Sequence, residues 1–497
     1  ENVLNICLKT GLVAIALLLV PLIDPAWAAD PTPVEAAKAA ADASQNSADT
    51  AWMLISSALV LFMTPGLAFF YGGFVRAKHM LNTVMMSFVM MGIVGVIWTL
   101  WGYSLAFAPG NKLIGGLDWL FLNKVNPEAG FYLAKDVMTS LGDVGVFVVD
   151  AVKGSPTEGF GSYAPTIPHQ LFMVYQMMFA IITPALISGA IVERVSFKAY
   201  FWFMFLWAGI LYPIFAHMVW GVGGALGVNG GLKALDFAGG TVVHISSGVS
   251  ALVAAWVIGP RRTYPNQPSA PHNVPFILLG AGILWFGWFG FNGGSALAAN
   301  GIATTAFVAT QIAAATAALM WVILEWVLRG KPTAVGIATG AVAGLVGITP
   351  AAGFVNPIGA LLIGAITSTA CFFAVSIKAK MQFDDSLDTF PIHGVGGTVG
   401  AILTGIFATK GVNPVFGKDL PVGLVDGNGA QVLNQLMAIA ITYVVAGVGT
   451  FAILKLLSVF MPLRAKEESE YEGLDINEHG EEAYGEDIAP GLSYSAK

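Results

Sequence analysis

Charged residues are scarce in this chain. They make up 11% of its 497 residues, whereas an ordinary soluble domain carries about 25%. Cysteine is scarce too, since only Cys7 and Cys371 occur and they lie in different apolar segments. Neither a disulfide framework nor a metal site is therefore indicated. A basic patch is also missing, which argues against binding of nucleic acid.

Sequence motifs of enzymes are missing as well. The chain shows no phosphate-binding loop and no motif of a metal or nucleophile site, so we expect neither an enzyme, an ATP-driven pump nor a bound cofactor. The net charge of -7 arises mostly near the C-terminus, where ten acidic residues fall between Glu467 and Asp487. It is therefore a local feature of the tail.

Long apolar runs are what the chain has in abundance, since 56% of its residues are apolar. Such a sequence cannot cover a water-facing surface, and it predicts an all-α integral membrane protein. Eleven runs are long enough for transmembrane helices: 51–74, 80–108, 168–192, 198–220, 238–259, 274–295, 302–328, 333–349, 356–377, 391–409 and 431–461.

The basic residues predict how these helices are oriented. All six arginines lie in alternate connections between the runs: Arg76, Arg194, Arg261, Arg262, Arg329 and Arg464. Positively charged connections stay in the cytoplasm. Eleven spans then place the N-terminus outside and the C-terminus inside, in a multi-pass protein of the cell (inner) membrane.

The two ends of the chain predict further regions. Lys9, an apolar run from about Gly11 to Ile23 and Ala26-Trp27-Ala28 resemble a secretory signal peptide. We expect four regions in all: a signal peptide at 1–29, an extracytoplasmic segment at 30–49, a membrane domain at 50–461 and a cytoplasmic regulatory tail at 462–497.

Two histidines stand inside apolar spans, one in each half of the chain. His244 follows Asp236 in the fifth span, and His393 follows Asp388 in the tenth. A titratable side chain at such depth is costly to desolvate and marks a functional site by default. One such histidine alone would more often serve packing, but the similar surroundings of these two favour a shared site. Two inverted repeats of five helices, with a last helix added, would place a substrate path at their interface.

Several short strings resemble the ammonium transporter family (Amt/Mep, related to Rh proteins). The most specific is Asp236-Phe-Ala-Gly-Gly-Thr-Val-Val-His244. The others are Tyr71-Gly-Gly, Gln176-Met-Met-Phe179-Ala, Ala216-His217-Met-Val-Trp220-Gly, Trp288-Phe-Gly-Phe291-Asn292-Gly-Gly-Ser295, Asp385-x-x-Asp388-x-x-x-x-His393 and, in the tail, Glu472-Gly-Leu-Asp475-x-x-x-His479-Gly480-Glu481. The resemblance covers about residues 50–486.

The resemblance implies a site with several levels. It places Trp220, Phe179 and Ser295 in an outer substrate-binding vestibule, with Phe179 and Phe291 stacked below as a gate. Asp236 would lie near the vestibule as a buried structural acid. The presence of Trp220 and Ser295 favours the Amt branch, because the Rh branch generally lacks them.

Deeper in the protein, the resemblance implies that His244 and His393 lie side by side in a pore. Read as straight helices, their spans would leave the two histidines at different depths, given a rise of about 1.5 Å per residue. Adjacency therefore requires that these helices begin below the membrane surface, inside protein walls. Tyr175 is one departure from the family, because many members carry Phe there.

These residue types suit the capture of ammonium and the passage of ammonia. An indole face holds a cation with about 0.5–2 kcal/mol, and a serine hydroxyl accepts a hydrogen bond from it. Two unprotonated imidazoles that share one hydrogen offer one donor and one acceptor to neutral ammonia. We therefore expect a transporter of ammonium and methylammonium. The alternative functions are an ammonium sensor with little transport and a cation-coupled secondary transporter. For the aromatic side chains taken alone, the alternative roles are packing and a position at the membrane interface.

The family also implies partners. Each subunit of a homotrimer would carry its own pore. We expect the tail to pack against the cytoplasmic face and to couple neighbouring subunits, and a PII-type regulatory protein to dock on that face. A solvated, disordered tail is the alternative.

Overall fold

The computed structural model describes residues 33–127, 163–228, 230–266, 270–412 and 421–484. The predicted signal peptide at 1–29 lies outside these residues. The chain divides into two compact units between Ser47 and Ala48, and the fold described below is that of the second unit. Helix α2 already begins at Pro33, so the described residues of the predicted segment 30–49 are helical.

Helices make up the second unit, and no named strand occurs in the part of the chain that the structure describes, which confirms the predicted all-α fold. The α-helices are α2 (Pro33–Phe74), α3 (Met80–Ile97), α4 (Tyr103–Phe107), α6 (His169–Ile187), α7 (Phe197–Leu206), α8 (Tyr212–Trp220), α9 (Ser246–Ile258), α10 (Val274–Gly293), α11 (Gly301–Arg329), α12 (Ala334–Ile348), α13 (Pro357–Lys380), α14 (Gly396–Phe407), α15 (Ala430–Phe460) and α16 (Glu467–Glu472). Within the described ranges, five π-helical turns adjoin them: η3 (Trp98–Gly102), η6 (Trp207–Leu211), η7 (Gly240–Ile245), η9 (Phe390–Val395) and η12 (Asp475–His479).

Ten helical segments within the described residues are long and apolar enough to cross a membrane, and they match ten of the eleven predicted spans. The remaining predicted span, 333–349, corresponds to α12, which has 15 residues. At about 1.5 Å per residue, α12 is shorter than the hydrocarbon core of a typical bilayer, which is about 30 Å thick. The eleventh span therefore stays a prediction.

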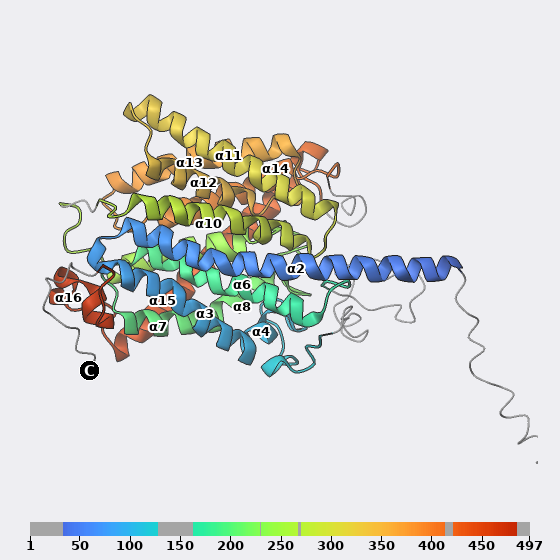
Figure 1. The fold of residues 1–497 in the computed structure, drawn as a ribbon, viewed down its shortest axis with the longest axis horizontal. Helices are drawn as coiled ribbons and strands as arrows, with labels where there is room; N and C mark the ends of the chain where they lie inside the picture. Colours follow the sequence, from blue (N-terminus) through green and yellow to red (C-terminus); the bar gives the residue numbers. More distant parts are fainter. Residues whose placement is uncertain (1–32, 128–162, 229, 267–269, 413–420, 485–497) are drawn as a thin grey trace, which may run out of the picture. The chain divides into compact units, whose positions relative to one another are not determined.

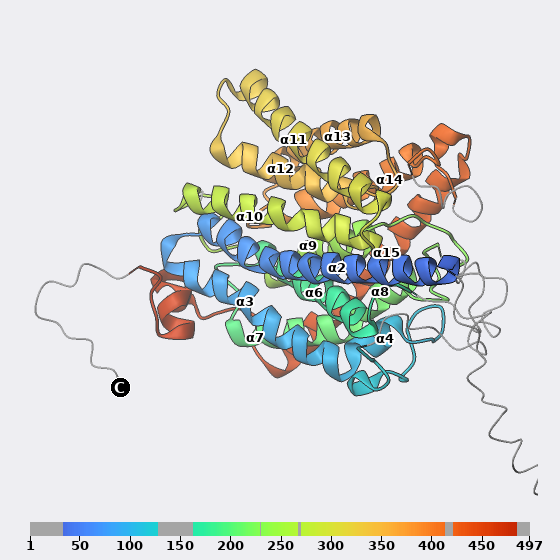
Figure 2. The same cartoon turned by 45° about the vertical axis from the view of Figure 1, so that its right-hand side comes forward.

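The helices fall into two groups along the sequence. In Figures 1 and 2 the later helices α10 to α14 lie above α2, α3, α6 and α8. Helix α15 returns from the later group and packs against α7 and α9 as well as α14. The interface between the two groups therefore runs through the middle of the second unit.

Corresponding helices of the two groups run in opposite directions. Trp52 near the start of the α2 span donates to the carbonyl of Gly293 at the end of α10 (3.3 Å), whereas the carbonyl of Gly73 at the end of α2 accepts from Asn273 before α10 (3.1 Å). The first and sixth spans are thus antiparallel. This is the arrangement that an inverted repeat requires.

The fifth and tenth spans cross with their backbones in contact. A Cβ atom added to Gly248 in α9 would lie only 2.2 Å from the amide nitrogen of Gly394, and one added to Gly397 in α14 would lie 3.0 Å from the Cβ of His244. Only glycine fits such a crossing. From His244 to Gly248 along one span, the partner in the other span moves back from Gly397 to Gly394, so these two helices are antiparallel as well.

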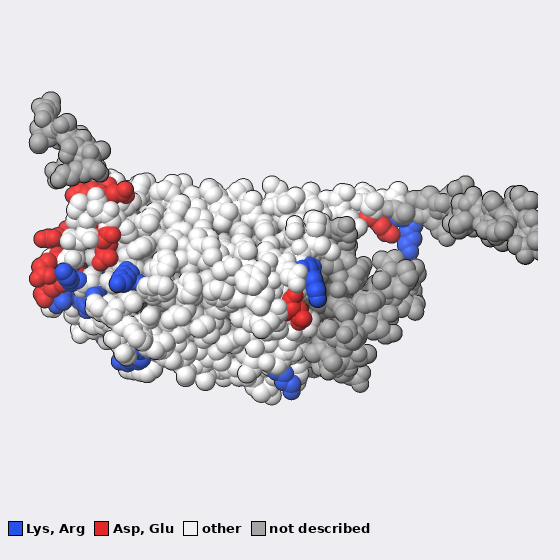
Figure 3. Space-filling view, turned by 90° about the horizontal axis from the view of Figure 1, so that it is seen from below, with Lys and Arg blue, Asp and Glu red and all other residues white. Residues whose placement is uncertain are grey.

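The surface of the bundle agrees with a membrane environment. Figure 3 shows a broad band without Lys, Arg, Asp or Glu between two ends that carry them. Large apolar side chains are exposed on several helices, for example Trp256 (65%) on α9 and Val448 (65%) on α15. Lipid tails are a suitable solvent for such a surface, whereas water is not. The chain is a multi-pass membrane protein.

The connections that carry arginine meet at one end, which we call the arginine end and which includes Arg76, Arg194, Arg261 and Arg464. Glu193 bridges Arg76 (3.1 Å) and Arg261 (3.2 Å). Burial raises the pKa of Glu193, but the charges of Arg261 and Arg76 outweigh it, so the pKa lies below its ordinary value. Burial lowers the pKa of Arg194 to about 10. A buried charge needs oppositely charged partners, as Glu193 has in Arg76 and Arg261.

The tail lies against the same end (Figure 1, α16). The Asp475 carboxylate accepts hydrogen bonds from the backbone N–H groups of Leu81 (2.9 Å) and Asn82 (2.8 Å) in the first turn of α3. The Glu478 carboxylate accepts one from the N–H of Phe197, the first residue of α7 (3.1 Å). These N–H groups have no partner within their own helices, so the tail caps two membrane helices.

Candidate functional site

The helix that carries His244 starts inside the protein. Its first residue, Gly240, is buried, and Asp236 in the segment that leads into the helix is 8% exposed. One Asp236 oxygen accepts from the N–H groups of Gly239 (2.8 Å) and Gly240 (2.6 Å), and the other accepts from the Thr241 N–H (2.8 Å) and hydroxyl and from the Val242 N–H (3.3 Å). Burial raises the pKa of Asp236, and these hydrogen bonds oppose the rise without cancelling it.

Asp385 plays the same part before His393. Its two oxygens accept from the N–H groups of Thr389 (3.0 Å) and Phe390 (2.7 Å), at the start of η9. Asp236 and Asp385 each precede their histidine by eight residues, and this equal spacing could have been found in the sequence. Asp388, which the sequence analysis placed before His393, instead pairs with Lys378 (2.5 Å).

The structure brings the two histidines together in one cavity. The Nδ1 atoms of His244 and His393 are 3.2 Å apart, and their rings are stacked at 5.3 Å with 23° between the planes. The short internal helices and their antiparallel crossing remove the difference in depth that straight spans would give. A hydrogen bond between two ring nitrogens uses one hydrogen. One ring must therefore donate at Nδ1 and the other must accept.

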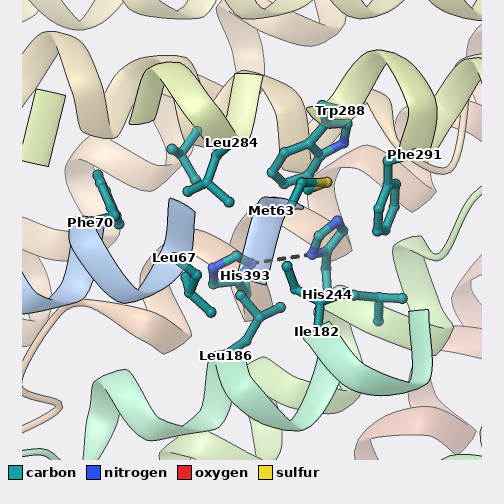
Figure 4. Close-up of a pocket in the computed structure, with 12 residues that line it drawn as sticks. Met63, Leu67, Phe70, Ile182, Leu186, His244, Leu284, Trp288, Phe291 and His393 are labelled. Carbon is teal, nitrogen blue, oxygen red and sulfur yellow. Dashed lines mark hydrogen bonds between the residues drawn. The ribbon is translucent and has the colours of Figure 1, made fainter. Parts of the chain in front are cut away.

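The cavity around the pair is narrow and mostly apolar (Figure 4). Trp288 stacks on His244 at 5.5 Å and 20°, and its indole N–H donates to the Thr349 hydroxyl (2.9 Å). Nε2 of His244 is buried and has no hydrogen-bond partner among the described residues. The cavity is lined by Met63, Leu67, Phe70, Ile182, Leu186, Val243, His244, Leu284, Trp288, Phe291, Val342 and His393.

Two phenyl rings lie next to the histidines. The rings of Phe179 on α6 and Phe291 on α10 are 4.2 Å apart at 36°, and Phe291 stacks on His244 at 6.1 Å. Both side chains are 1% exposed. They form a buried apolar layer between Trp220 and His244.

Beyond the phenyl rings lie side chains that are partly exposed. Trp220 contacts Phe179 edge-on at 5.8 Å and 88°, and its indole N–H donates to the backbone carbonyl of Asp236 (3.0 Å). The Ser295 hydroxyl donates to the carbonyl of Phe291 (2.8 Å). Ser295 follows the end of α10, so this part of the site lies at the end of the bundle opposite the arginine end. The indole face and the hydroxyl oxygen can both bind a cation.

Two other buried polar side chains, those of His217 and Asp384, bind structural partners. The ring nitrogens of His217 lie 3.0 and 2.7 Å from the carbonyl oxygens of Ala106 and Asn111, so this histidine ties α8 to the end of α4 and the loop after it. Asp384 pairs with Arg261 (2.8 Å) at the arginine end. Among the residues that the structure describes, no group of three or more His, Cys, Asp or Glu could hold a metal ion.

Comparisons with known proteins agree on one family. The model of the Ammonium Transporter Family matches residues 51–484. The chain is 48% identical to the ammonium transporter of Bacillus subtilis (strain 168) over 88% of this chain and 98% of that protein. It resembles the crystal structure of Saccharomyces cerevisiae Mep2 (TM-score 0.72, 35% identity, 85% of this chain and 88% of that chain). It also resembles a structure described as a sensor Amt protein (TM-score 0.73, 28% identity, 88% and 99%). The family resemblance of the sequence is confirmed, and the chain belongs to the ammonium transporter family.

Proposed function

We propose that this protein carries ammonium across the cell (inner) membrane by removing a proton from it and conducting ammonia. The order of the side chains supports this proposal most directly. A partly exposed indole and hydroxyl, a dry pair of phenyl rings and a hydrogen-bonded pair of imidazoles follow one another by ring contacts of 5.8, 4.2 and 6.1 Å. The outer level meets ammonium, and the imidazoles meet ammonia.

Capture takes place at Trp220 and Ser295. The indole face attracts the cation with about 0.5–2 kcal/mol, depending on how far it is desolvated, and the serine oxygen accepts one of its N–H groups. Potassium matches ammonium closely in size but has no N–H group to donate. Binding at this level is weak, as conduction requires.

The phenyl rings of Phe179 and Phe291 exclude the charged form. An ion that loses its water between two buried rings meets a large desolvation cost, whereas neutral ammonia does not. We infer that ammonium gives up one proton at or near this layer, so that NH4+ becomes NH3 and H+. The proton returns to the outer solvent or follows separately along imidazoles and water.

The imidazoles of His244 and His393 then provide the polar contacts of an apolar passage. Because they share one hydrogen between their Nδ1 atoms, a neutral pair presents one Nε2 as acceptor and the other as donor. Ammonia can hydrogen-bond to either. No bond other than N–H is made or broken, so the activity is transport and not enzymatic conversion.

Uptake by reconstituted protein tests the proposal. Purified protein in liposomes should take up methylammonium, and His244→Ala and His393→Ala should slow it. Loss of a hydrogen-bonding group in an apolar passage costs about 1–3 kcal/mol, which corresponds to a rate about 5- to 150-fold lower. His169→Gln is a matched control, because His169 is buried outside this cavity and pairs with Tyr103 (2.6 Å).

Currents recorded from the same liposomes separate net ammonia flux from net ammonium flux. A potassium flux as large as the ammonium flux in the wild type would refute the filter at the phenyl rings. Trp220→Leu should weaken ammonium binding, whereas Trp202→Leu, at a side chain that is 41% exposed on α7, should not.

Sensing is the second candidate function. The similarity to a structure described as a sensor Amt protein, at 28% identity, is the observation that favours it. A sensor would bind ammonium at Trp220 and Ser295 but conduct little. Saturable ammonium binding together with liposome uptake no faster than through empty liposomes would establish sensing and exclude the proposed transport.

We further propose that the protein works as a homotrimer with its C-terminus in the cytoplasm. The contacts of Asp475 and Glu478 with α3 and α7 support a regulatory role of residues 462–497, since they link the tail to helices of the membrane domain. A PII-type protein would dock on this face and act through the tail. Deletion of the residues after Pro462 should then change uptake or its response to nitrogen supply, and unchanged uptake under all nitrogen conditions would refute the role.

A further inference from the structure

The hydroxyl group of Tyr175 on α6 lies behind the outer site and takes no part in the function proposed above. Tyr175 is fully buried. Its hydroxyl oxygen is 2.9 Å from the carbonyl oxygen of Gly290, 2.8 Å from that of Phe291 and 3.2 Å from the hydroxyl oxygen of Ser295. One side chain of α6 therefore contacts both a gate residue at the end of α10 and a capture residue just after it.

Counting hydrogens assigns the direction of these bonds. Carbonyl oxygens can only accept, and the two carbonyls are nearer to the Tyr175 hydroxyl than Ser295 is, so the hydrogen of Tyr175 points to the carbonyls. The hydrogen of Ser295 then has two inward acceptors, the Phe291 carbonyl (2.8 Å) and the oxygen of Tyr175 (3.2 Å). Both draw this hydrogen into the protein. The lone pairs of the Ser295 oxygen are left to face the partly exposed side.

The aromatic ring of Tyr175 fixes the position of its hydroxyl. The ring packs edge-on against Phe179 at 5.1 Å and 65°, and Phe179 in turn stacks on Phe291 at 4.2 Å. A buried side chain in such packing keeps one rotamer. The hydroxyl is therefore a fixed point from which the orientation of Ser295 is set.

We propose that Tyr175 is a positioning residue that holds Ser295 as a hydrogen-bond acceptor and thereby sets the ammonium affinity of the outer site. This inference rests on the proposed function, because it assigns Tyr175 a role in the same capture step. Tyr175 acts through Ser295 and does not itself contact the cation. Without its hydroxyl, Ser295 loses one of its two inward acceptors and can turn its own hydrogen toward the cation.

Tyr175→Phe tests the proposal, because it removes the hydroxyl and keeps the ring. The KM for ammonium, measured by its competition with methylammonium uptake, should rise about two- to tenfold. This is the effect of one net hydrogen bond. KM does not depend on the amount of protein that folds, so a partial folding defect would lower the maximal rate instead. Tyr200→Phe is the matched control, since the buried Tyr200 also donates to a backbone carbonyl, that of Met86 (2.7 Å), on α3.

The double variant Tyr175→Phe/Ser295→Ala decides whether the effect passes through Ser295. Its KM should equal that of Ser295→Ala alone. A KM unchanged in Tyr175→Phe, or effects of the two substitutions that multiply, would overturn the inference while leaving transport by the wild type intact. Absence of uptake by the wild type would overturn the proposed function and this inference with it.

Thermal unfolding gives a second reading of the hydrogen assignment. Ser295→Ala leaves the bonds from Tyr175 to the two carbonyls in place, whereas Tyr175→Phe removes them. The melting temperature should therefore fall further in Tyr175→Phe than in Ser295→Ala. The reverse order would mean that the hydrogen of Tyr175 serves Ser295, which contradicts the proposed arrangement.

Discussion

Substitution of Asp236 by Asn gives a sharp test of how the first internal helix is held. The carboxylate serves the backbone N–H groups of three consecutive residues from Gly239 to Thr241, and that of Val242 at longer range, and it does so with both oxygens. Asparagine keeps one oxygen and replaces the other by an NH2 group, which can only donate. Whichever way the amide turns, at least two N–H groups then face a donor.

The expected cost follows from this count of hydrogen bonds. A buried donor left without a partner costs about 1–3 kcal/mol, so Asp236→Asn should destabilise the protein by about 2–6 kcal/mol. Asp385 accepts only one N–H group per oxygen, from Thr389 and Phe390. Asp385→Asn therefore leaves one donor unpaired and should cost about 1–3 kcal/mol.

Thermal unfolding of purified protein in detergent, followed by tryptophan fluorescence, compares the variants. The melting temperature should be lowest for Asp236→Asn and intermediate for Asp385→Asn. Asp118→Asn, at an exposed aspartate outside the spans, should match the wild type. If Asp385→Asn lowered the melting temperature as much as Asp236→Asn or more, the reasoning from hydrogen-bond counts would be wrong.

Three more predictions concern the crossing, the arginine end and the tail. Gly248→Ala should prevent folded protein from accumulating, because its Cβ would lie 2.2 Å from the nitrogen of Gly394, whereas Gly282→Ala, with no atom within 4 Å, should fold normally; equal yields would contradict this. Burial raises the pKa of Glu193, but the neighbouring arginines lower it more, so it lies below the ordinary value of 4.5. The charge of Glu193 therefore stabilises the folded state above pH 4.5. This stabilisation is lost as the pH falls below 4.5 and through the pKa of the folded state. The melting-temperature difference between wild type and Glu193→Gln should accordingly be largest at neutral pH and shrink in acid, and a constant difference would argue against it. Asp475→Ala should speed hydrogen exchange of the first α3 amides and proteolysis of the tail, and unchanged protection would show that the tail is held by other contacts.

Span positions could be predicted well from the sequence. The predicted run 302–328 corresponds to α11 (Gly301–Arg329), and 274–295 corresponds to α10 (Val274–Gly293). The reason is chemical: apolar runs stop at polar residues, and the side chains of Asn273 and Asn300 accept hydrogen bonds from the first turns of these two helices. Composition and local capping suffice for this level of structure.

The geometry between spans could not be predicted in this way. Counted along straight helices, His244 and His393 lie at different depths. The sequence positions of the spans contain no information on where a helix starts inside the protein or on how two helices cross. The contacts of α9 with η9 and of α14 with η7 depend on glycines that are far apart in the sequence. The pairing of Asp388 with Lys378, which leaves capping to Asp385, likewise depends on a neighbouring helix, α13.

The backbone contact at Gly248 and Gly394 has a consequence for how the protein can move. The two imidazoles belong to opposite repeats, and their shared hydrogen spans 3.2 Å between Nδ1 atoms. A rocking motion of one repeat against the other, by which many carriers expose a site to each side in turn, would either drive backbone atoms into each other or pull the two nitrogens apart. The proposed transport past this pair would therefore proceed through a standing passage, with only side chains such as the phenyl rings giving way.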